Sequence, residues 1–176
     1  MRARRLKAML AEHFDFVWRS LRRMGVPAAD VDDAAQNVFL VAARRLDQIM
    51  SDRDRAFLFA TAVRVASTFR RAVRRHPEEP SLELEQVQSS ALSPEDLSEL
   101  SRARPLLQGI LEEMSLEQRS VFILCELEEL ESQEVADLLD VPLGTVYSRL
   151  RGAREIFQSA ARRLSARDSF RRKAKP

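Results

Sequence analysis

The sequence has 176 residues, of which 45% are hydrophobic and 32% charged, with four glycines and a formal net charge of +2. That composition is typical of a soluble, mainly helical protein with one domain or two small ones. No apolar run reaches the length of a membrane span, and the N-terminus lacks the apolar core of a signal peptide, so we expect a cytoplasmic protein without membrane insertion.

The first predicted element is a helix that ends at Gly25, just before Pro27, because these two residue types are common where helices stop. Its apolar residues recur every three or four positions, which predicts the face that it buries. The residues of that face are Phe14, Val17, Trp18 and Leu21.

A second helix is predicted to follow Asp30. Its inner side is small and apolar and consists of Val31, Ala34, Ala35, Val38, Ala42 and Leu46. Its outer side, called the outer strip below, consists of Asp32, Asp33, Gln36 and Asn37. This pattern predicts a helix that packs in a bundle on one side and meets solvent or a partner on the other.

A third helix is predicted over residues 55–75, after a loop at residues 48–54. We expect Phe59 in the core, whereas Phe57 at the helix start fits the core or the surface equally well. After Arg55 at its start, the basic residues of this helix are Arg64, Arg70, Arg71, Arg74 and Arg75. Because basic groups follow a nucleic-acid backbone and aromatic rings stack on exposed bases, the helix favours binding of single-stranded DNA.

A segment rich in proline, serine and acidic residues separates this block from the next one. Such a composition predicts a flexible acidic linker. Its end has the signature of a helix start, with Ser93 as the cap, and we expect that helix to run into or abut the next apolar segment. We therefore predict an all-α fold of two small helical domains, residues 1–76 and 105–176, joined by a linker at residues 77–104.

Residues 132–157 predict a short helix, a tight turn and a second helix. In the first helix Val135, Leu138 and Leu139 share one face. The turn contains a proline and a glycine, and Thr145 is well placed to cap the helix that follows.

The second helix of this pair has two contrasting sides. Its apolar stripe consists of Val146, Leu150, Ala153, Phe157 and Ala161. Its opposite face carries Tyr147, Ser148, Arg149, Arg151 and Arg154. A helix pair of this kind, polar and basic on the outside of its second member, describes a helix-turn-helix whose second helix enters a major groove.

The charge distribution supports that interpretation. Between Glu112 and Asp140 there are ten acidic residues and one base, Arg119, whereas between Gly144 and Pro176 there are ten bases and two acids. DNA binding needs basic groups gathered on one face, so we predict that the C-terminal segment with its basic tail contacts DNA. The acidic segment is then expected to face away from the duplex or toward another protein. The plainer alternative is two solvated faces of a helical bundle.

The two blocks together resemble an extracytoplasmic-function (ECF) sigma factor of bacterial RNA polymerase, of the minimal type with regions 2 and 4. Asp30, Asp33, Gln36 and Phe39 match the D-x-x-D-x-x-Q-x-x-F core of region 2 in this family. The segment from M-S-L-E-Q-R to S-R-L-R-G-A-R, residues 114–154, is similar to region 4. The resemblance covers nearly the whole chain.

The resemblance implies a subunit that binds core polymerase and directs it to promoters. It assigns core binding to Asp33, Gln36, Asn37 and Phe39, with Phe39 as an apolar anchor in a polar strip. It assigns the −10 element to Phe57, Arg64, Arg70, Arg71, Arg74 and Arg75. It assigns the −35 element to Thr145, Tyr147, Ser148, Arg149, Arg151 and Arg154.

Further roles follow from the same resemblance. The loop at residues 48–54 falls where a flipped base is read, and of the −35 residues we expect Arg151 to read a base and Arg154 to bind the backbone. The partners implied are core RNA polymerase, promoter DNA as duplex and as melted single strand, and an anti-sigma protein that covers both domains.

Several positions depart from the family pattern. Phe57 stands where tryptophan is usual, and Val65 and Thr68 replace the usual asparagine and aspartate. Tyr147 stands where the family commonly has a lysine or arginine, and Gly152 where a large or basic residue is common. These substitutions predict either weak promoter melting or an unusual promoter.

Two other classes of function are alternatives to a sigma factor. A stand-alone helix-turn-helix regulator explains the C-terminal motif but gives no role to Asp33, Gln36 and Phe39. An enzyme is not expected, because His13 and His76 lie far apart and no phosphate loop, metal-spaced cluster or nucleophile signature is present. We therefore predict no cofactor, and we expect the single cysteine, Cys125, to be a core thiol.

Overall fold

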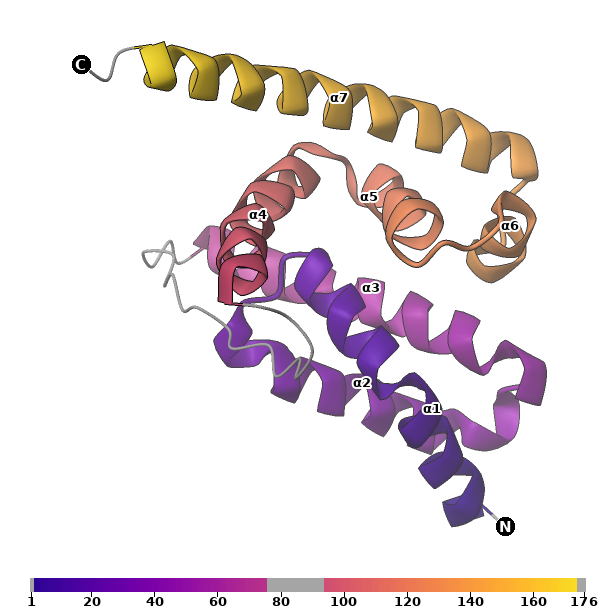
Figure 1. Ribbon diagram of the computed structural model, residues 1–176. Helices are drawn as coiled ribbons and strands as arrows, with labels where there is room; N and C mark the ends of the chain where they lie inside the picture. The colour runs from indigo at the N-terminus through magenta and orange to yellow at the C-terminus, as the bar shows by residue number, and fades with distance from the viewer. Residues whose placement is uncertain (1, 76–93, 174–176) are drawn as a thin grey trace. The chain divides into compact units, whose positions relative to one another are not determined.

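The computed structural model describes residues 2–75 and 94–173, and the side chains of residues 2–69 and 103–166. These residues form α-helices joined by short turns, with no strand in the described ranges (Figure 1). The all-α prediction is thereby confirmed. The chain divides into two compact units, Met1–Arg104 and Pro105–Pro176.

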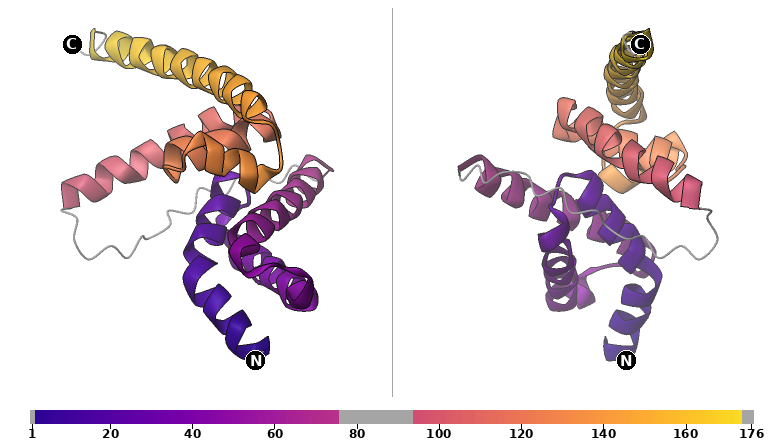
Figure 2. Two further views of the ribbon diagram at one scale, coloured as in Figure 1. Left: turned by 90° about the vertical axis from the view of Figure 1, so that its right-hand side faces the viewer. Right: turned by 60° about the vertical axis from the view of Figure 1, so that its left-hand side comes forward.

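The first unit is a bundle of three helices, α1 (Arg2–Arg23), α2 (Val31–Arg45) and α3 (Asp54–Arg75). Each of the three packs against the other two, as the views in Figure 2 show. Gly25 has a φ of 95°, a backbone conformation that favours glycine, and it turns the chain out of α1 as predicted. Short 3-10 turns lie at Ala28–Asp30, Leu46–Gln48 and Ser51–Arg53.

The buried face of α1 differs from the predicted one. It consists of Met9, Phe16, Val17, Ser20 and Leu21. Phe14 is 37% exposed and Trp18 is half-buried, so neither belongs to the centre of that face. The reason is the position of α3, whose Phe59 ring lies 5.9 Å from the ring of Phe16 and draws that side of α1 into the core.

The inner side of α2 is as predicted, because all six expected residues are buried. They are Val31, Ala34, Ala35, Val38, Ala42 and Leu46. Alanines at three of these positions allow close packing against the neighbouring helices. The outer strip is exposed, again as predicted, so the helix presents four polar side chains to its surroundings.

The second unit contains α5 (Leu116–Phe122), the π turn η4 (Ile123–Leu127), α6 (Ser132–Leu139) and α7 (Leu143–Lys173). Helix α4 (Pro94–Glu113) leads into it and continues through Pro105. Residues 94–104 of the predicted linker are therefore helical and run into the next apolar segment, as expected for the end of the linker. Residues 77–93 of the linker, and the proposed cap Ser93, lie outside the described residues.

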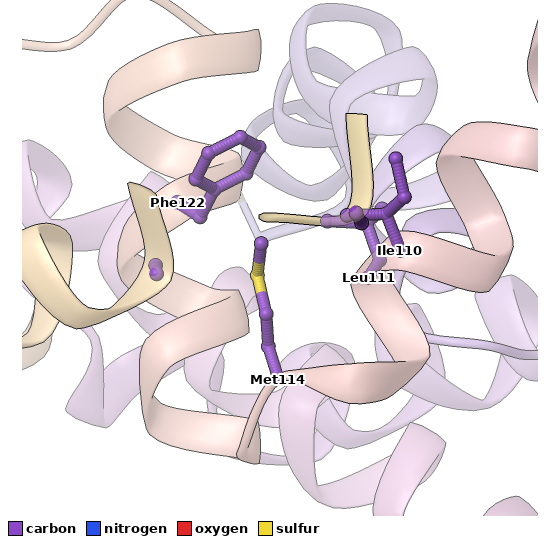
Figure 3. Packing of buried hydrophobic residues seen from close by; sticks show 6 residues of the cluster. Ile110, Leu111, Met114 and Phe122 are labelled. Carbon is purple, nitrogen blue, oxygen red and sulfur yellow. The ribbon is translucent and has the colours of Figure 1, made fainter. Parts of the chain in front are cut away.

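The core of the second unit joins α4, α5 and α7. Its buried members are Ile110, Leu111, Met114, Phe122, Ala153 and Ala160. Figure 3 shows the Met114 side chain extending from the end of α4 towards the Phe122 ring, and that ring stacks on Phe157 of α7 at 5.3 Å. This packing holds α7 against α4 and α5 and leaves the opposite side of α7 to solvent.

Candidate nucleic-acid interface

Helix α6, the turn after it and the start of α7 form the predicted helix-turn-helix. A capping box opens α6, in which the Glu131 N–H donates to Glu134 Oε2 at 2.9 Å. Asp140 ends the helix in the left-handed conformation, with a φ of 54°, and the chain turns into α7. The first turns of α7, residues 143–157, are called the recognition helix below.

Thr145 does not cap the recognition helix, contrary to the prediction. The helix begins two residues earlier, at Leu143, and the Thr145 N–H donates to the Pro142 carbonyl at 2.8 Å. Thr145 therefore lies inside the first turn and is half-buried. Proline cannot donate a hydrogen bond but its carbonyl can accept one, which explains why the helix starts directly after Pro142.

The apolar stripe of α7 was predicted correctly over its first half. Val146, Leu150 and Ala153 are buried, and Phe157 is half-buried in its stack on Phe122. Further along, Ala160 rather than Ala161 is buried. Ala153 and Ala160 belong to one hydrophobic cluster with Ile110 and Leu111 of α4.

The opposite face of the recognition helix is exposed and contains most of the predicted DNA-binding side chains. Tyr147 is 56% exposed, and Ser148, Arg151 and Arg154 are also exposed, whereas Arg149 is half-buried. The Ser148 hydroxyl donates to the Thr145 carbonyl at 3.0 Å, within the helix. The exposed face of the recognition helix is therefore polar and carries the positive charges of Arg151 and Arg154.

The arginines of α7 differ in how they are paired. Arg154 contacts Glu126 Oε1 with its Nε at 2.8 Å and its Nη2 at 2.6 Å. Arg163 forms two 2.7 Å hydrogen bonds to the carboxylate of Glu113. Arg151 has no ion pair within the described part of the chain. Arg151 and Arg154 are the two arginines expected to contact DNA most directly, and of these only Arg154 forms an ion pair within the described residues.

The acidic segment between Glu112 and Asp140 contacts α7. This contact was not predicted from the sequence, which indicated a segment that faces away from the duplex or toward another protein. Glu113 and Glu126 both belong to that segment and both form ion pairs with α7 arginines. Hydrogen bonds from its own backbone N–H and from the Ser115 hydroxyl hold the pKa of Glu117 below its ordinary value of 4.5, and the charge of Arg149 lowers that pKa further. The acidic residues thus supply counter-charges to the basic helix.

Cys125 lies in the π turn next to Glu126 and is half-buried, so it is a partly covered thiol rather than a fully buried core residue. Burial raises its pKa, as does the charge of Glu126. A raised pKa keeps the thiol protonated at neutral pH and makes it a poor nucleophile.

In the first unit the core-binding prediction needs one correction. Asp33, Gln36 and Asn37 are exposed on the outer strip, but Phe39 is only 5% exposed and stacks on Phe14, with ring centroids 6.2 Å apart. Phe39 is therefore not an exposed apolar anchor. Its neighbour Leu40, which sequence reasoning missed, is 47% exposed.

Helix α3 carries the residues predicted for single-stranded DNA. Phe59 is fully buried, as predicted, while Phe57 is half-buried and Arg64 exposed. The Thr68 hydroxyl donates to the Arg64 carbonyl at 3.1 Å. The backbone of the basic end belongs to α3, but the side chains of Arg70, Arg71, Arg74 and Arg75 lie outside the described residues.

The loop between α2 and α3 is anchored at several points. Arg5 of α1 donates hydrogen bonds to the carbonyls of Leu46 and Ile49 at 3.0 and 2.7 Å, and to Asp54 Oδ1 at 2.8 Å. Met50 projects from this loop and is 67% exposed. Sequence reasoning missed Arg5, because its partners lie more than forty residues away and no local pattern connects them.

Among the described residues no three histidine, cysteine, aspartate or glutamate side chains gather in a way that would hold a metal ion. Within the same ranges, no helix combines the length and the apolar character needed to cross a membrane. The surfaces above are therefore the candidate site.

Comparison with known proteins connects both units to one family. Residues 98–156 match the family model "Sigma-70, region 4". The ECF RNA polymerase sigma-E factor of Escherichia coli is 30% identical over 151 residues, which cover 81% of this chain and 79% of that protein.

Two solved structures share the fold. One is CnrH in complex with the cytosolic domain of CnrY, with a TM-score of 0.63, 22% identity and coverage of 92% of this chain and 88% of that one. The other is the sigma factor RpoE in complex with the anti-sigma factor NepR from Bartonella quintana, with a TM-score of 0.62, 18% identity and coverage of 89% and 96%.

Proposed function

The chain belongs to the ECF sigma factors of RNA polymerase, and from that premise we propose that it binds core polymerase and directs transcription from a small set of promoters. In this role it is a specificity subunit and not an enzyme. It acts in the cytoplasm, where the polymerase and the chromosome are. The observation that carries the proposal is the exposed basic face of the recognition helix, presented by a packed helix-turn-helix.

The C-terminal unit is proposed to bind the −35 element as duplex DNA. Arg151 extends from the exposed face of the recognition helix without an ion pair in the described part of the chain, so its guanidinium is available to a guanine edge. Tyr147 and Ser148 lie beside it nearer the start of the helix. Arg154 lies at the flank, where a phosphate is the expected contact.

The N-terminal unit is proposed to bind core polymerase with α2 and the −10 element with α3. The outer strip offers polar side chains, and Leu40 beside it offers the apolar contact that a reversible interface needs. Arg64 on α3 is exposed and able to follow a single-stranded backbone. Met50, exposed in the loop before α3, is proposed to contact an unstacked base.

An anti-sigma protein is proposed as the regulatory partner. The solved structure of the sigma factor RpoE includes the anti-sigma factor NepR, and that of CnrH includes part of CnrY. An anti-sigma protein would cover the surfaces that otherwise bind polymerase and DNA. Loss of core binding when such a protein is added would support this part of the proposal.

The test of the proposed function is transcription in vitro with purified core polymerase and fragmented genomic DNA. We expect discrete start sites that share spaced −10 and −35 elements. The double variant Arg151→Ala, Arg154→Ala should lose transcription from those promoters and keep its binding to core polymerase. Arg163→Ala is the matched control on the same helix, because Arg163 is held by Glu113 outside the recognition helix, and it should stay active.

Core binding is tested separately by capture of the polymerase. Gln36→Ala and Leu40→Ala change exposed residues and should weaken capture without unfolding the chain. Phe39→Ala is unsuitable because that ring is buried. If both exposed variants capture polymerase as well as wild type does, α2 is not the docking surface, and a stand-alone DNA-binding regulator becomes the better description.

A further inference from the structure

The ion pair between Arg154 and Glu126 joins the flank of the recognition helix to the helices that precede it. Arg154 uses Nε and Nη2 on the same carboxylate oxygen, at 2.8 and 2.6 Å, across 28 residues of sequence. The side chains remain 56% and 33% exposed, so the pair lies at the surface where DNA is proposed to bind. One edge of the guanidinium is therefore occupied before any nucleic acid arrives.

The position of Glu126 comes from an irregular element. It belongs to the π turn Ile123–Leu127, in which the Glu128 N–H donates to the Ile123 carbonyl at 2.9 Å. A π turn contains one more residue per hydrogen-bonded ring than an α-helix, and it rotates the side chains that follow. Here the turn continues α5 after Phe122 is anchored in the core, and the Glu126 carboxylate reaches α7.

We propose that Glu126 is an internal counter-charge that competes with DNA phosphates for Arg154, and so weakens the binding of duplex DNA of any sequence. This inference rests on the proposed function of the recognition helix. A carboxylate and a phosphate offer the guanidinium the same kind of charge-assisted hydrogen bonds, and they therefore compete for it. Non-specific binding depends almost entirely on such phosphate contacts.

The ion pair affects Arg154 and not Arg151. Arg151 has no ion pair in the described part of the chain and faces outward, so Glu126 does not compete for it. Neutralising a phosphate-binding arginine at the flank lowers affinity for all sequences equally, whereas a base-reading arginine keeps its contribution at the correct site. The ratio of specific to non-specific affinity is therefore unchanged, and the expected effect of Glu126 is a lower affinity for duplex DNA of any sequence.

The experiment measures binding of the full chain to a fluorescent duplex of randomised sequence, by anisotropy, at several potassium chloride concentrations. Four proteins are compared: wild type, Glu126→Gln, Arg154→Ala and the double variant. We expect Glu126→Gln to bind about two- to fivefold more tightly, the range that an exposed ion pair supports. Its salt slope should become steeper by about 0.9, the value for one additional phosphate contact.

The dependence on Arg154 separates this inference from a general effect of charge. In the Arg154→Ala background the gain from Glu126→Gln should disappear. Glu129→Gln is the matched control, because Glu129 is an exposed acid of the same segment and no ion pair is found for it in the described residues. Its substitution should change affinity less, and equally with or without Arg154.

Three results would overturn the inference. Equal gains from Glu126→Gln with and without Arg154 would mean that any removed negative charge has the same effect. A loss of affinity would mean that Glu126 orients Arg154 for DNA instead of withholding it. No change would mean that the pair is irrelevant to binding. Failure of the wild-type chain to bind duplex DNA at low salt would instead count against the proposed function itself, and would remove the premise of this inference.

Discussion

Gly152 departs from the family pattern, and the structure gives a physical reason for the small residue. A Cβ at this position would lie 2.7 Å from Nε2 of Gln118. Gln118 belongs to the capping box of α5, in which its Oε1 accepts from the Ser115 N–H at 3.1 Å and its own N–H donates to the Ser115 hydroxyl at 3.2 Å. Gly152 thus lets α7 pass close to the start of α5 while the cap stays intact.

The substitution Gly152→Ala should therefore have opposing effects on the second unit. Alanine is about 1 kcal/mol better than glycine inside a helix. Displacing Gln118 removes a hydrogen bond worth about 1 kcal/mol. We expect a net change within about 0.5 kcal/mol in the wild-type background, and a gain of about 1 kcal/mol in the Gln118→Ala background, where the clash is gone. Urea unfolding of the four proteins measures both values.

Gly109→Ala is the control for that cycle. Gly109 lies in α4, and an added Cβ there meets no atom within 4 Å. It should stabilise by about 1 kcal/mol in both backgrounds, since only helix propensity changes. If Gly152→Ala behaves like this control, Gln118 moves aside without cost and the small residue at 152 has another cause.

At the scale of elements, the loop between α2 and α3 is stabilised by contacts with a side chain of α1. Leu46 and Ile49 of the loop are buried, and the partly buried Arg5 binds the carbonyls of both. The same guanidinium pairs with Asp54, the first residue of α3, at 2.8 Å. One side chain therefore fixes the loop and the start of the helix together, and leaves Met50 exposed between them.

Replacing Arg5 should loosen this loop and lower stability. Arg5→Met removes three hydrogen bonds from a charged donor and leaves the Asp54 carboxylate partly buried and without this partner, so we expect a loss of about 1.5–3 kcal/mol. Hydrogen exchange of the amides in residues 48–53 should accelerate. Urea unfolding and mass spectrometry of exchanged peptides provide the two measurements.

Arg2→Met is the matched control for Arg5. Arg2 also reaches from α1 to this part of the chain, to Asp47 at 3.1 Å and to the Ala43 carbonyl at 3.0 Å, but its ion pair is largely exposed. Exposed pairs contribute little, so we expect a change below about 0.5 kcal/mol. Equal losses from the two substitutions would contradict the assignment of the loop anchor to Arg5.

The contrast between α1 and α2 shows how far the sequence determines such elements. The inner side of α2 was predictable, because its alanines and valines follow the helical period and the polar residues fill the rest of the turn. The face of α1 was not, because apolar residues surround Val17 on both sides and only the position of Phe59 in α3 selects Phe16 over Phe14. Phe39 was misassigned for the same reason, since its stack on Phe14 is a tertiary contact.

The candidate site, like the helices of the first unit, was predictable only where local sequence patterns determine it. The basic face of the recognition helix followed from periodicity and charge, both of which are local properties of the sequence. The pairing of Arg154 with Glu126 and of Arg163 with Glu113 was not predictable, because it joins residues 28 and 50 positions apart. Local patterns give the face of a helix, but they do not show which of its charges are already engaged.

At the scale of the whole molecule, each compact unit has a hydrophobic core of its own. Leu58 in α3 is fully buried in the first unit, and Leu111 in α4 is fully buried in the second. A unit with its own core unfolds as a cooperative domain. The two units should therefore give two separable unfolding transitions in the full-length chain.

Matched core substitutions test this independence. Leu58→Ala and Leu111→Ala each remove the same atoms from a fully buried position, and each should cost about 2–5 kcal/mol. Because a loss of 1 kcal/mol lowers the melting temperature of a domain of 60–100 residues by about 4–8 °C, each variant should lower one transition by roughly 10 °C or more. Scanning calorimetry of the full chain should show Leu58→Ala moving one transition and Leu111→Ala the other. A single transition that both variants lower equally would mean that the two cores unfold as one cooperative structure, and the division into units would then describe geometry but not stability.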